Sequence, residues 1–350
     1  MNGQKRIRDY HIHIGEMAAG ERNSITDVPG VQVGHCTVAA GEVQSGVTAV
    51  LPADGNLFSS KVMAAVSVFN GFGKSMGLMQ IEELGTIETP ILLTNTLCVG
   101  GVTQALVHAT LEENRAIENP IRTVNPLVLE CNDYYLNDIQ KCAIGSCHVR
   151  EALGNLSVEF AEGSVGAGRG MSCYRLQGGI GSASRRMELD GRTCHLGSLV
   201  LTNMGLTKEL LVDGKAIGKT IAERMAADNQ PDCGSIIVIL GCDIPLTERQ
   251  LQRIANRAIV GISRTGSHLA HGSGEVAVAF STQNRVAHVK QDNCSIASIQ
   301  MLFEPDMDLL FRAAIESVEE AILNSMITAE RVVGVSGHSR PLLKEFAALL

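Results

Sequence analysis

A serine stands where a buried strand begins, and its neighbours would let it act as a nucleophile. In the segment PDCGSIIVILGCDIPL, at positions 231–246, the uninterrupted apolar run 236–240 is typical of a strand buried on both faces. Ser235 precedes this run, and Gly234 before it has no Cβ that would crowd its carbonyl. The Ser235 hydroxyl can attack that carbonyl, form an ester and, after hydrolysis, become the first residue of a new chain. The freed α-amino group, with a reference pKa of about 7.7 to 8.0, would then supply a base on the same residue.

Such a reaction also needs an oxyanion donor and polar groups that activate the nucleophile. Asn203 closes the apolar segment 196–205 and can donate a hydrogen bond to a developing oxyanion. Ser273 and Glu275 stand two residues apart where another strand begins, so we expect them on one face, polarising the serine or its amine. Residues of these types are also common turn and cap residues at strand ends, and the spacing alone leaves both interpretations open.

The elements that must position these residues alternate between strands and helices along the whole chain. Hydrophobic patterns and turn residues predict strands at 46–52, 64–73, 85–96, 125–130, 196–205, 236–240 and 274–282. They predict helices at 103–113, after a Gly-Gly break, and at 215–227, 247–264 and 307–329. The segment 228–235 reads as a polar loop, and the glycine clusters within 162–186 favour tight turns. We therefore expect a single α/β domain over residues 1–350.

Composition excludes several classes of partner. The formal net charge is −8 with scattered Lys and Arg, and aromatic residues make up only 3%, which argues against a nucleic-acid surface. No apolar stretch is long enough to span a membrane, and the N-terminal residues lack the pattern of a signal peptide. The ten cysteines are spread without CxxC spacing, so we expect reduced, mostly buried thiols and a cytoplasmic protein. Small molecules or further copies of the chain are the expected partners.

The sequence contains no complete motif for binding a phosphate group, a dinucleotide or a metal ion. NGFGKS at 70–75 resembles a phosphate-binding loop, but that motif requires glycine where Val68 stands. GAGRGM at 166–171 has the wrong glycine spacing for a dinucleotide fingerprint. Some histidines and cysteines lie close together, but no group completes a tetrahedral ligand set: His11 with His13, His35 with Cys36, and Cys142, Cys147 and His148. We expect neither a metal nor an organic cofactor.

Several motifs, in the same order and nearly from end to end, resemble those of the DmpA-type aminopeptidases. This family of L-aminopeptidase/D-amidases and β-peptidyl aminopeptidases consists of self-processing N-terminal nucleophile hydrolases. The similar segments are ITDVPGVQVGH (25–35), TPILLTNT (89–96), LND (136–138), EGSVGAGRGM (162–171), GGIGSASR (178–185), TNMG (202–205), GSIIVILGCDIPL (234–246), ISRTGS (262–267), GSGE (272–275) and VEEAILN (318–324).

The resemblance implies a four-layer αββα sandwich, and cleavage between Gly234 and Ser235 into an α chain 1–234 and a β chain 235–350. It implies a cofactor-free aminopeptidase or amidase that forms an acyl-enzyme from short peptides, amino-acid amides or esters, and assembles as a homo-oligomer, commonly a tetramer of processed units. The roles it implies are Ser235 as the nucleophile, Asn203 in the oxyanion hole, Ser273 with Glu275 as the supporting pair, and Glu130 as the acceptor of the substrate's amino group.

One position departs from the family pattern. Asn132 stands where family members tend to carry an aromatic residue near the active site, although Tyr134 and Tyr135 follow closely. An altered substrate pocket and a shifted alignment both explain this difference.

Two other functions remain open at this point. An acyltransferase of the ornithine acetyltransferase type would share the self-processing architecture, but it uses a threonine nucleophile, and Ser235 argues against it. A scaffold or metabolite-binding relative would keep an ordinary Gly234–Ser235 bond, with Ser235 as no more than the first residue of a strand.

Overall fold

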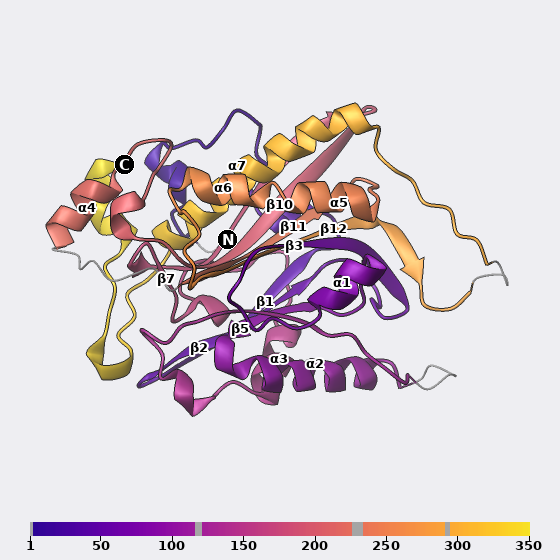
Figure 1. Cartoon of the computed structure of the whole chain (residues 1–350), viewed down its shortest axis with the longest axis horizontal. Helices are drawn as coiled ribbons and strands as arrows, with labels where there is room; N and C mark the ends of the chain where they lie inside the picture. The colour runs from indigo at the N-terminus through magenta and orange to yellow at the C-terminus, as the bar shows by residue number, and fades with distance from the viewer. Residues whose placement is uncertain (1–2, 116–120, 226–233, 291–294) are drawn as a thin grey trace.

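Two β-sheets lie face to face between two helical layers (Figure 1). The computed structural model describes residues 3–115, 121–225, 234–290 and 295–350. Within these residues one sheet has the order β1-β2-β5-β6, a second has the order β4-β3-β12-β11-β10-β9, and β7 pairs with β8 alone. The strands are β1 (Gln32–Ala40), β2 (Val43–Leu51), β3 (Ser60–Gly71), β4 (Thr86–Ile87), β5 (Ile91–Asn95), β6 (Leu127–Cys131), β7 (Ser172–Cys173), β8 (Leu176–Gln177), β9 (Gly179–Leu189), β10 (Arg192–Asn203), β11 (Ser235–Cys242) and β12 (Gly274–Ala287).

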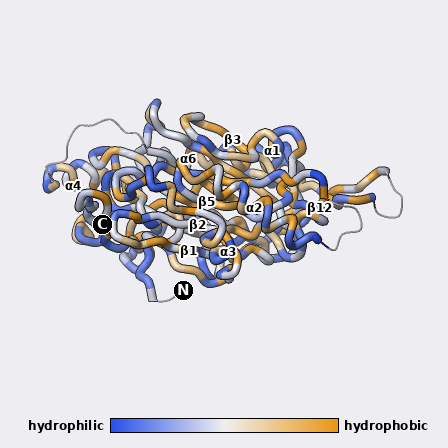
Figure 2. Tube along the Cα trace, turned by 90° about the horizontal axis from the view of Figure 1, so that it is seen from below, coloured by the Kyte–Doolittle hydropathy of each residue, from blue (hydrophilic) through white to orange (hydrophobic). Residues whose placement is uncertain are grey.

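Most of the described helices lie on the two outer faces. They are α1 (Leu78–Leu84), α2 (Val99–Glu113), α3 (Ser146–Gly154), α4 (Gly218–Met225), α5 (Glu248–Ala255), α6 (Ala258–Arg264) and α7 (Met307–Ile327). Helices α2 and α3 cover the four-stranded sheet, as the view from below shows (Figure 2), and α5, α6 and α7 cover the six-stranded sheet (Figure 1). The predicted four-layer αββα sandwich is confirmed. None of the described helices is long and apolar enough to cross a membrane.

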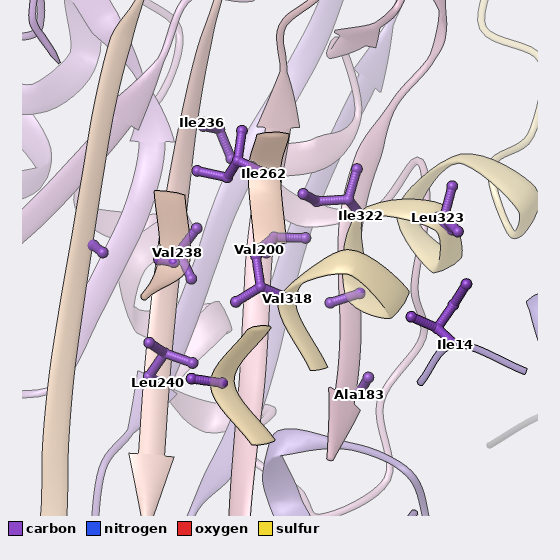
Figure 3. Close-up of a cluster of buried hydrophobic side chains, with 14 of the residues drawn as sticks. Ile14, Ala183, Val200, Ile236, Val238, Leu240, Ile262, Val318, Ile322 and Leu323 are labelled. Atoms are coloured by element: carbon purple, nitrogen blue, oxygen red, sulfur yellow. The ribbon is translucent and has the colours of Figure 1, made fainter. Parts of the chain in front are cut away.

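Strand β11 lies in the middle of the larger sheet and is buried on both faces. Ile236, Val238 and Leu240 point toward α6 and α7, among Ile262, Val318 and Ile322 (Figure 3). The alternate residues Ile237 and Ile239 belong to the core between the two sheets. Burying each such side chain contributes about 1.5 to 3 kcal/mol, which explains why the run carries no polar residue.

The structure corrects several predicted elements. The helix predicted at 247–264 is two helices, since α5 ends at Ala255 and α6 begins at Ala258. The side chain of the C-cap residue Asn256 accepts a hydrogen bond from the Ser67 hydroxyl of β3 at 2.7 Å. Helix α2 begins at Val99, so the Gly-Gly pair lies in its first turn and not before it. The strand predicted at 85–96 is divided into β4 and β5 by a short segment that ends at Pro90.

Two long strands differ from the sequence prediction. Strand β1 was not predicted, and β9 runs through a segment whose glycines favoured turns. Gly181 of β9 is needed for a close approach, since a Cβ there would lie 2.0 Å from the carbonyl oxygen of Ala321 in α7. The last two residues of the helix predicted at 215–227, and the predicted loop 228–235 up to residue 233, lie outside the described residues.

Most cysteines in the described part of the chain are buried thiols. Five of them are buried: Cys36, Cys98, Cys131, Cys173 and Cys242. Burial raises the pKa of the Cys242 thiol to about 12, which keeps it protonated and unreactive.

A buried ionic network fastens α7 to β9. The fully buried Arg185 guanidinium donates from Nε to Oε2 of Glu316 at 3.0 Å and from Nη2 to Oε2 of Glu320 at 2.8 Å. Glu320 also accepts two hydrogen bonds from Arg8, and these cations hold the pKa of its carboxyl below the usual value against the opposing effect of burial. Removing the arginine would leave two carboxylates buried with fewer partners.

Replacing Arg185 with methionine should therefore lower the free energy of unfolding by about 3 to 5 kcal/mol, the usual result of breaking a buried ion pair from one side. Arg186 is exposed on the same strand, and Arg186→Met should change stability by less than about 0.5 kcal/mol. Urea denaturation of both variants checks this expectation. Equal stabilities would contradict the structural role of the network.

Candidate active site

The pairing of three strands brings the candidate residues together at one end of the larger sheet. Ser235 is the first residue of β11, and it faces Asn203 of β10 on one side and Gly274 of β12 on the other. By strand alternation the Ser235 side chain points the same way as Ile237, toward the other sheet. It is 4% exposed, so a candidate nucleophile lies at the inner end of a nearly closed site.

Asn203 is held in one orientation. Its Oδ1 accepts a hydrogen bond from the backbone N–H of Ser172 at 2.9 Å, and its Nδ2 donates to the carbonyl oxygen of Asn132 at 2.8 Å. Because an amide nitrogen carries two hydrogens, one N–H remains for a further acceptor beside Ser235. This geometry suits an oxyanion donor whose orientation is set before a ligand arrives.

The Glu130 carboxylate lies near the end of β6 and is 4% exposed. Its Oε1 accepts the backbone N–H of Lys74 at 2.8 Å, and its Oε2 accepts the hydroxyl of Thr96. Within the described residues no basic side chain forms an ion pair with it, so both of its hydrogen-bond donors are neutral groups. A buried carboxylate held in this way is well placed to receive an ammonium group from a ligand.

Ser235 and Glu130 line the same small cavity of about 30 Å³. Its other lining residues are Phe72, Lys74, Thr96, Asn132, Gly234 and Gly272. A space of this size admits a water molecule but not an amino-acid residue. The uncut Gly234 therefore borders a space that a substrate would need to enter.

Glycine is the only residue type that fits at position 234. A Cβ there would lie 1.9 Å from the carbonyl oxygen of Asn203, far inside van der Waals contact. The Gly234 carbonyl oxygen itself accepts the backbone N–H of Gly274 at 3.3 Å, which polarises the bond that Ser235 would attack. Close packing against β10 therefore requires glycine immediately before Ser235.

Ser273 and Glu275 are both completely buried beside β11. The Ser273 hydroxyl has no hydrogen-bond partner among the residues that the structure describes. Glu275 pairs in parallel register with Ile236, so its side chain projects from the helix-facing side of the sheet, opposite to that of Ser235. The carboxylate therefore lies beside the main chain of Ser235 and does not face its hydroxyl directly.

Sequence reasoning missed the residues that hold this site in place. Thr96 and the Lys74 backbone bind Glu130, and Asn70 donates from Nδ2 to the carbonyl oxygens of Ser273 at 2.5 Å and Ala270 at 2.8 Å. The sequence signal for these residues was the polar, glycine-containing segment 70–75, which was interpreted only as a possible phosphate-binding loop. Its Gly73 leaves room for the carboxylate, since a Cβ there would lie 3.3 Å from Oε1 of Glu130.

Asn132, and not a tyrosine, lines the cavity. Its Oδ1 accepts the backbone N–H of Tyr134, whose side chain is 55% exposed. The Tyr135 ring stacks on the ring of His338, with 4.7 Å between the ring centroids. The Arg340 guanidinium lies 3.5 Å from the centroid of the same tyrosine ring. The aromatic residue in the cavity lining is Phe72, which comes from the end of β3.

Comparison with known proteins assigns the family. The sequence pattern of peptidase family S58 matches residues 23–340. The chain belongs to peptidase family S58. The family resemblance inferred from the sequence is thereby confirmed.

Individual relatives of this S58 chain carry aminopeptidase names. It is 35% identical to the beta-peptidyl aminopeptidase BapA of Sphingosinicella microcystinivorans, over 94% of this chain and 90% of that protein. The structure resembles the PH0078 protein of Pyrococcus horikoshii OT3, with a TM-score of 0.92 and 45% sequence identity. The match covers 99% of this chain and 98% of that one.

A second solved structure is the L-aminopeptidase D-Ala-esterase/amidase of Ochrobactrum anthropi, described as a variant of the Ntn hydrolase fold. It has a TM-score of 0.90 and 33% identity, and the match covers 99% of this chain and 98% of that one. The S58 protein is thus an enzyme of the serine aminopeptidase and amidase class.

Beside the candidate active site of the S58 protein lies a buried acid, Asp133. It is 1% exposed, and its carboxylate accepts the Ser45 hydroxyl at 2.6 Å and Nδ2 of Asn137 at 2.9 Å. Burial raises the pKa of this carboxyl to about 7, although both hydrogen bonds act in the opposite direction. Asp133 therefore changes its charge near neutral pH, next to the residue whose carbonyl orients Asn203.

This pKa predicts a pH-dependent stability. The proton bound by folded Asp133 favours the folded state fully below pH 4, and this contribution is lost as the pH rises through about 7. We expect the stability of the wild type relative to Asp133→Asn to fall by up to about 1.4 kcal/mol per pH unit between pH 4 and 7. Urea denaturation of both proteins across this range measures the difference. A difference independent of pH would show that Asp133 stays ionised.

Proposed function

We propose that Ser235 is the nucleophile of two successive reactions: cleavage of its own chain, and hydrolysis of small substrates with a free N-terminus. The observation that carries the proposal is that the Ser235 hydroxyl and the Glu130 carboxylate, which lacks a cation partner within the described residues, line one cavity. The substrates would be short peptides, amino-acid amides or esters. The names of the relatives, a β-peptidyl aminopeptidase and an aminopeptidase/amidase, support this class.

In the first reaction the Ser235 oxygen attacks the Gly234 carbonyl carbon. The carbon–nitrogen bond between the two residues breaks, the hydroxyl proton passes to the departing nitrogen, and an ester joins Gly234 to the Ser235 oxygen. The N–H of Gly274, at 3.3 Å from the Gly234 oxygen, would stabilise the negative charge that develops there. Water then hydrolyses the ester and leaves an α chain 1–234 and a β chain 235–350.

This cleavage would also prepare the site for substrates. The cavity of about 30 Å³ is bordered by Gly234, and release of this residue from Ser235 would allow it to withdraw. Self-cleavage therefore creates the free amine of Ser235 and opens the space where an amide could bind.

In the second reaction Glu130 would bind the ammonium group of the substrate and thereby place its carbonyl at Ser235. The Ser235 amine takes the hydroxyl proton as the acyl-enzyme forms and returns it to the leaving amine. Asn203 would stabilise the oxyanion, an effect typically worth about 3 to 4 kcal/mol. Ser273, whose hydroxyl has no hydrogen-bond partner within the described residues, and Glu275 would hold the amine beside the main chain of Ser235. None of these steps calls for a metal or an organic cofactor.

Assembly and location complete the proposal. We infer from the family resemblance that processed αβ units form a homo-oligomer, a tetramer, and that the enzyme works in the cytoplasm with its thiols reduced. Analytical ultracentrifugation of the processed protein measures the assembly directly.

Replacement of the nucleophile should abolish self-cleavage. Purified wild type should contain two chains, one beginning at Ser235, whereas Ser235→Ala should remain a single chain without amidase activity. Intact mass and N-terminal sequencing distinguish the two. Ser281, a fully buried serine on β12, provides a matched control, and Ser281→Ala should still be cleaved. A single uncut and inactive wild-type chain would favour a binding protein instead.

Neutralising Glu130 should separate the two reactions. Glu130→Gln keeps the size of the side chain but loses the charge that binds ammonium, a hydrogen bond typically worth about 1.5 to 3 kcal/mol. We expect kcat/KM for amino-acid amides to fall about 10- to 150-fold, while self-cleavage continues because it involves no ammonium group. An unchanged kcat/KM would contradict the assigned role of Glu130.

A further inference from the structure

A second and larger cavity adjoins the active site. It has a volume of about 490 Å³ and lies between the segment that follows β3 and the first turns of α2. Its lining residues are Lys74, Met76, Thr96, Val99, Gly100, Thr103 and Gln104. Lys74 and Thr96 also line the cavity that contains Ser235. The two spaces therefore share a wall.

That shared wall is formed by the residues that hold Glu130. The Lys74 backbone N–H and the Thr96 hydroxyl each donate to one oxygen of its carboxylate. A substrate with its amino group at Glu130 and its carbonyl at Ser235 would place the intervening carbon atoms along this wall. The side chain of its N-terminal residue branches from those carbons, so the larger cavity begins where that side chain leaves the main chain.

The surface that lines the larger cavity is mostly apolar, although Lys74, Thr96, Thr103 and Gln104 are polar residues. Met76 and Val99 contribute aliphatic surface, and Gly100 contributes no side chain at all. The Thr103 hydroxyl is buried and lacks a hydrogen-bond partner within the described part of the chain. The Lys74 ammonium lies 4.7 Å from the ring centroid of Phe72, on the side of the active site, and brings a positive charge to this region.

We propose that this cavity receives the side chain of the substrate's N-terminal residue and selects long apolar side chains, such as those of leucine, methionine and phenylalanine. The proposal rests on the proposed function. The volume lies within the usual range of small-molecule sites, about 300 to 1,000 Å³, and exceeds what an alanine methyl group could fill. The charge of Lys74 disfavours a cationic side chain in the same place.

Gly100 offers a direct way to fill the cavity. A Cβ at Gly100 meets no atom within 4 Å, so a larger side chain there would extend into open space. The neighbouring Gly101 is different, because its Cβ would lie 3.7 Å from the carbonyl oxygen of Ile144 and Gly101 does not line the cavity. Both positions lie inside α2, where any ordinary side chain favours the helix over glycine. Loss of the fold is therefore not expected.

The experiment compares kcat/KM for the amides of alanine, leucine, phenylalanine and lysine in wild type, Gly100→Ala, Gly100→Leu and the control Gly101→Ala. Partial burial of a leucine side chain in this open cavity predicts that wild type prefers leucine amide over alanine amide about tenfold. This ratio should decrease in Gly100→Ala, approach about one in Gly100→Leu, and keep its wild-type value in Gly101→Ala. Lysine amide should be the poorest of the long substrates in wild type.

Three results would overturn the proposal. The first is an unchanged leucine-to-alanine ratio in both Gly100 variants. The second is a change that follows the leaving group, seen with p-nitroanilides of the same amino acids, and not the N-terminal residue. The third is a wild type that hydrolyses none of these substrates, which would remove the proposed function as well. In the first two cases amide hydrolysis persists, so failure of the side-chain assignment is distinguishable from failure of the proposed function.

Discussion

The enclosure of β11 is the constraint on which the rest of the structure depends. Its two faces are covered by apolar side chains, and its two edges are paired with β10 and β12. If the register of β11 shifted by one residue, every side chain of the strand would move to the opposite face of the sheet. Ser235 would then point toward the helices, and Ile236 toward the candidate site. The register that the core requires therefore also sets Ser235 opposite Asn203 and beside Gly274. The sheet thereby fixes the relative positions of Ser235, Asn203 and Gly274.

The distribution of buried charge separates structural groups from chemical ones. Most buried glutamates pair with a cation of the chain: Glu88 with Lys61, Glu162 with Arg6, Glu316 and Glu320 with Arg185, and Glu319 with Arg264. Glu130 is equally buried, but a hydroxyl and a main-chain N–H hold it. Since a buried carboxylate without a cation lowers stability, this arrangement supports the proposal that the ammonium group of a substrate supplies the missing charge.

Much of the architecture followed from the sequence, and the failures have physical causes. Periodicity identified α7 and the strand after Ser235 because both are long and patterned by burial. It failed for β9, where Gly181 serves a close contact with α7 that no local pattern records. Ser235, Asn203, Ser273 and Glu275 were proposed because their polarity interrupts apolar runs, whereas Glu130 was proposed only from the family resemblance. Thr96 and Asn70 were not found, since their importance arises only from contacts with residues distant in the chain.

The order of the strands has a consequence for a molecule whose backbone is broken before Ser235. In the larger sheet, β11 and β12 come from the part of the chain after this point, while the strands on either side of them, β3 and β10, come from the part before it. The two pieces would thus interlock along two ladders, and neither could leave as an intact unit. Once both had unfolded, however, their reunion would be a second-order process, whose yield falls on dilution. Refolding of the uncut chain would be independent of protein concentration, whereas refolding of the cleaved protein would depend on it.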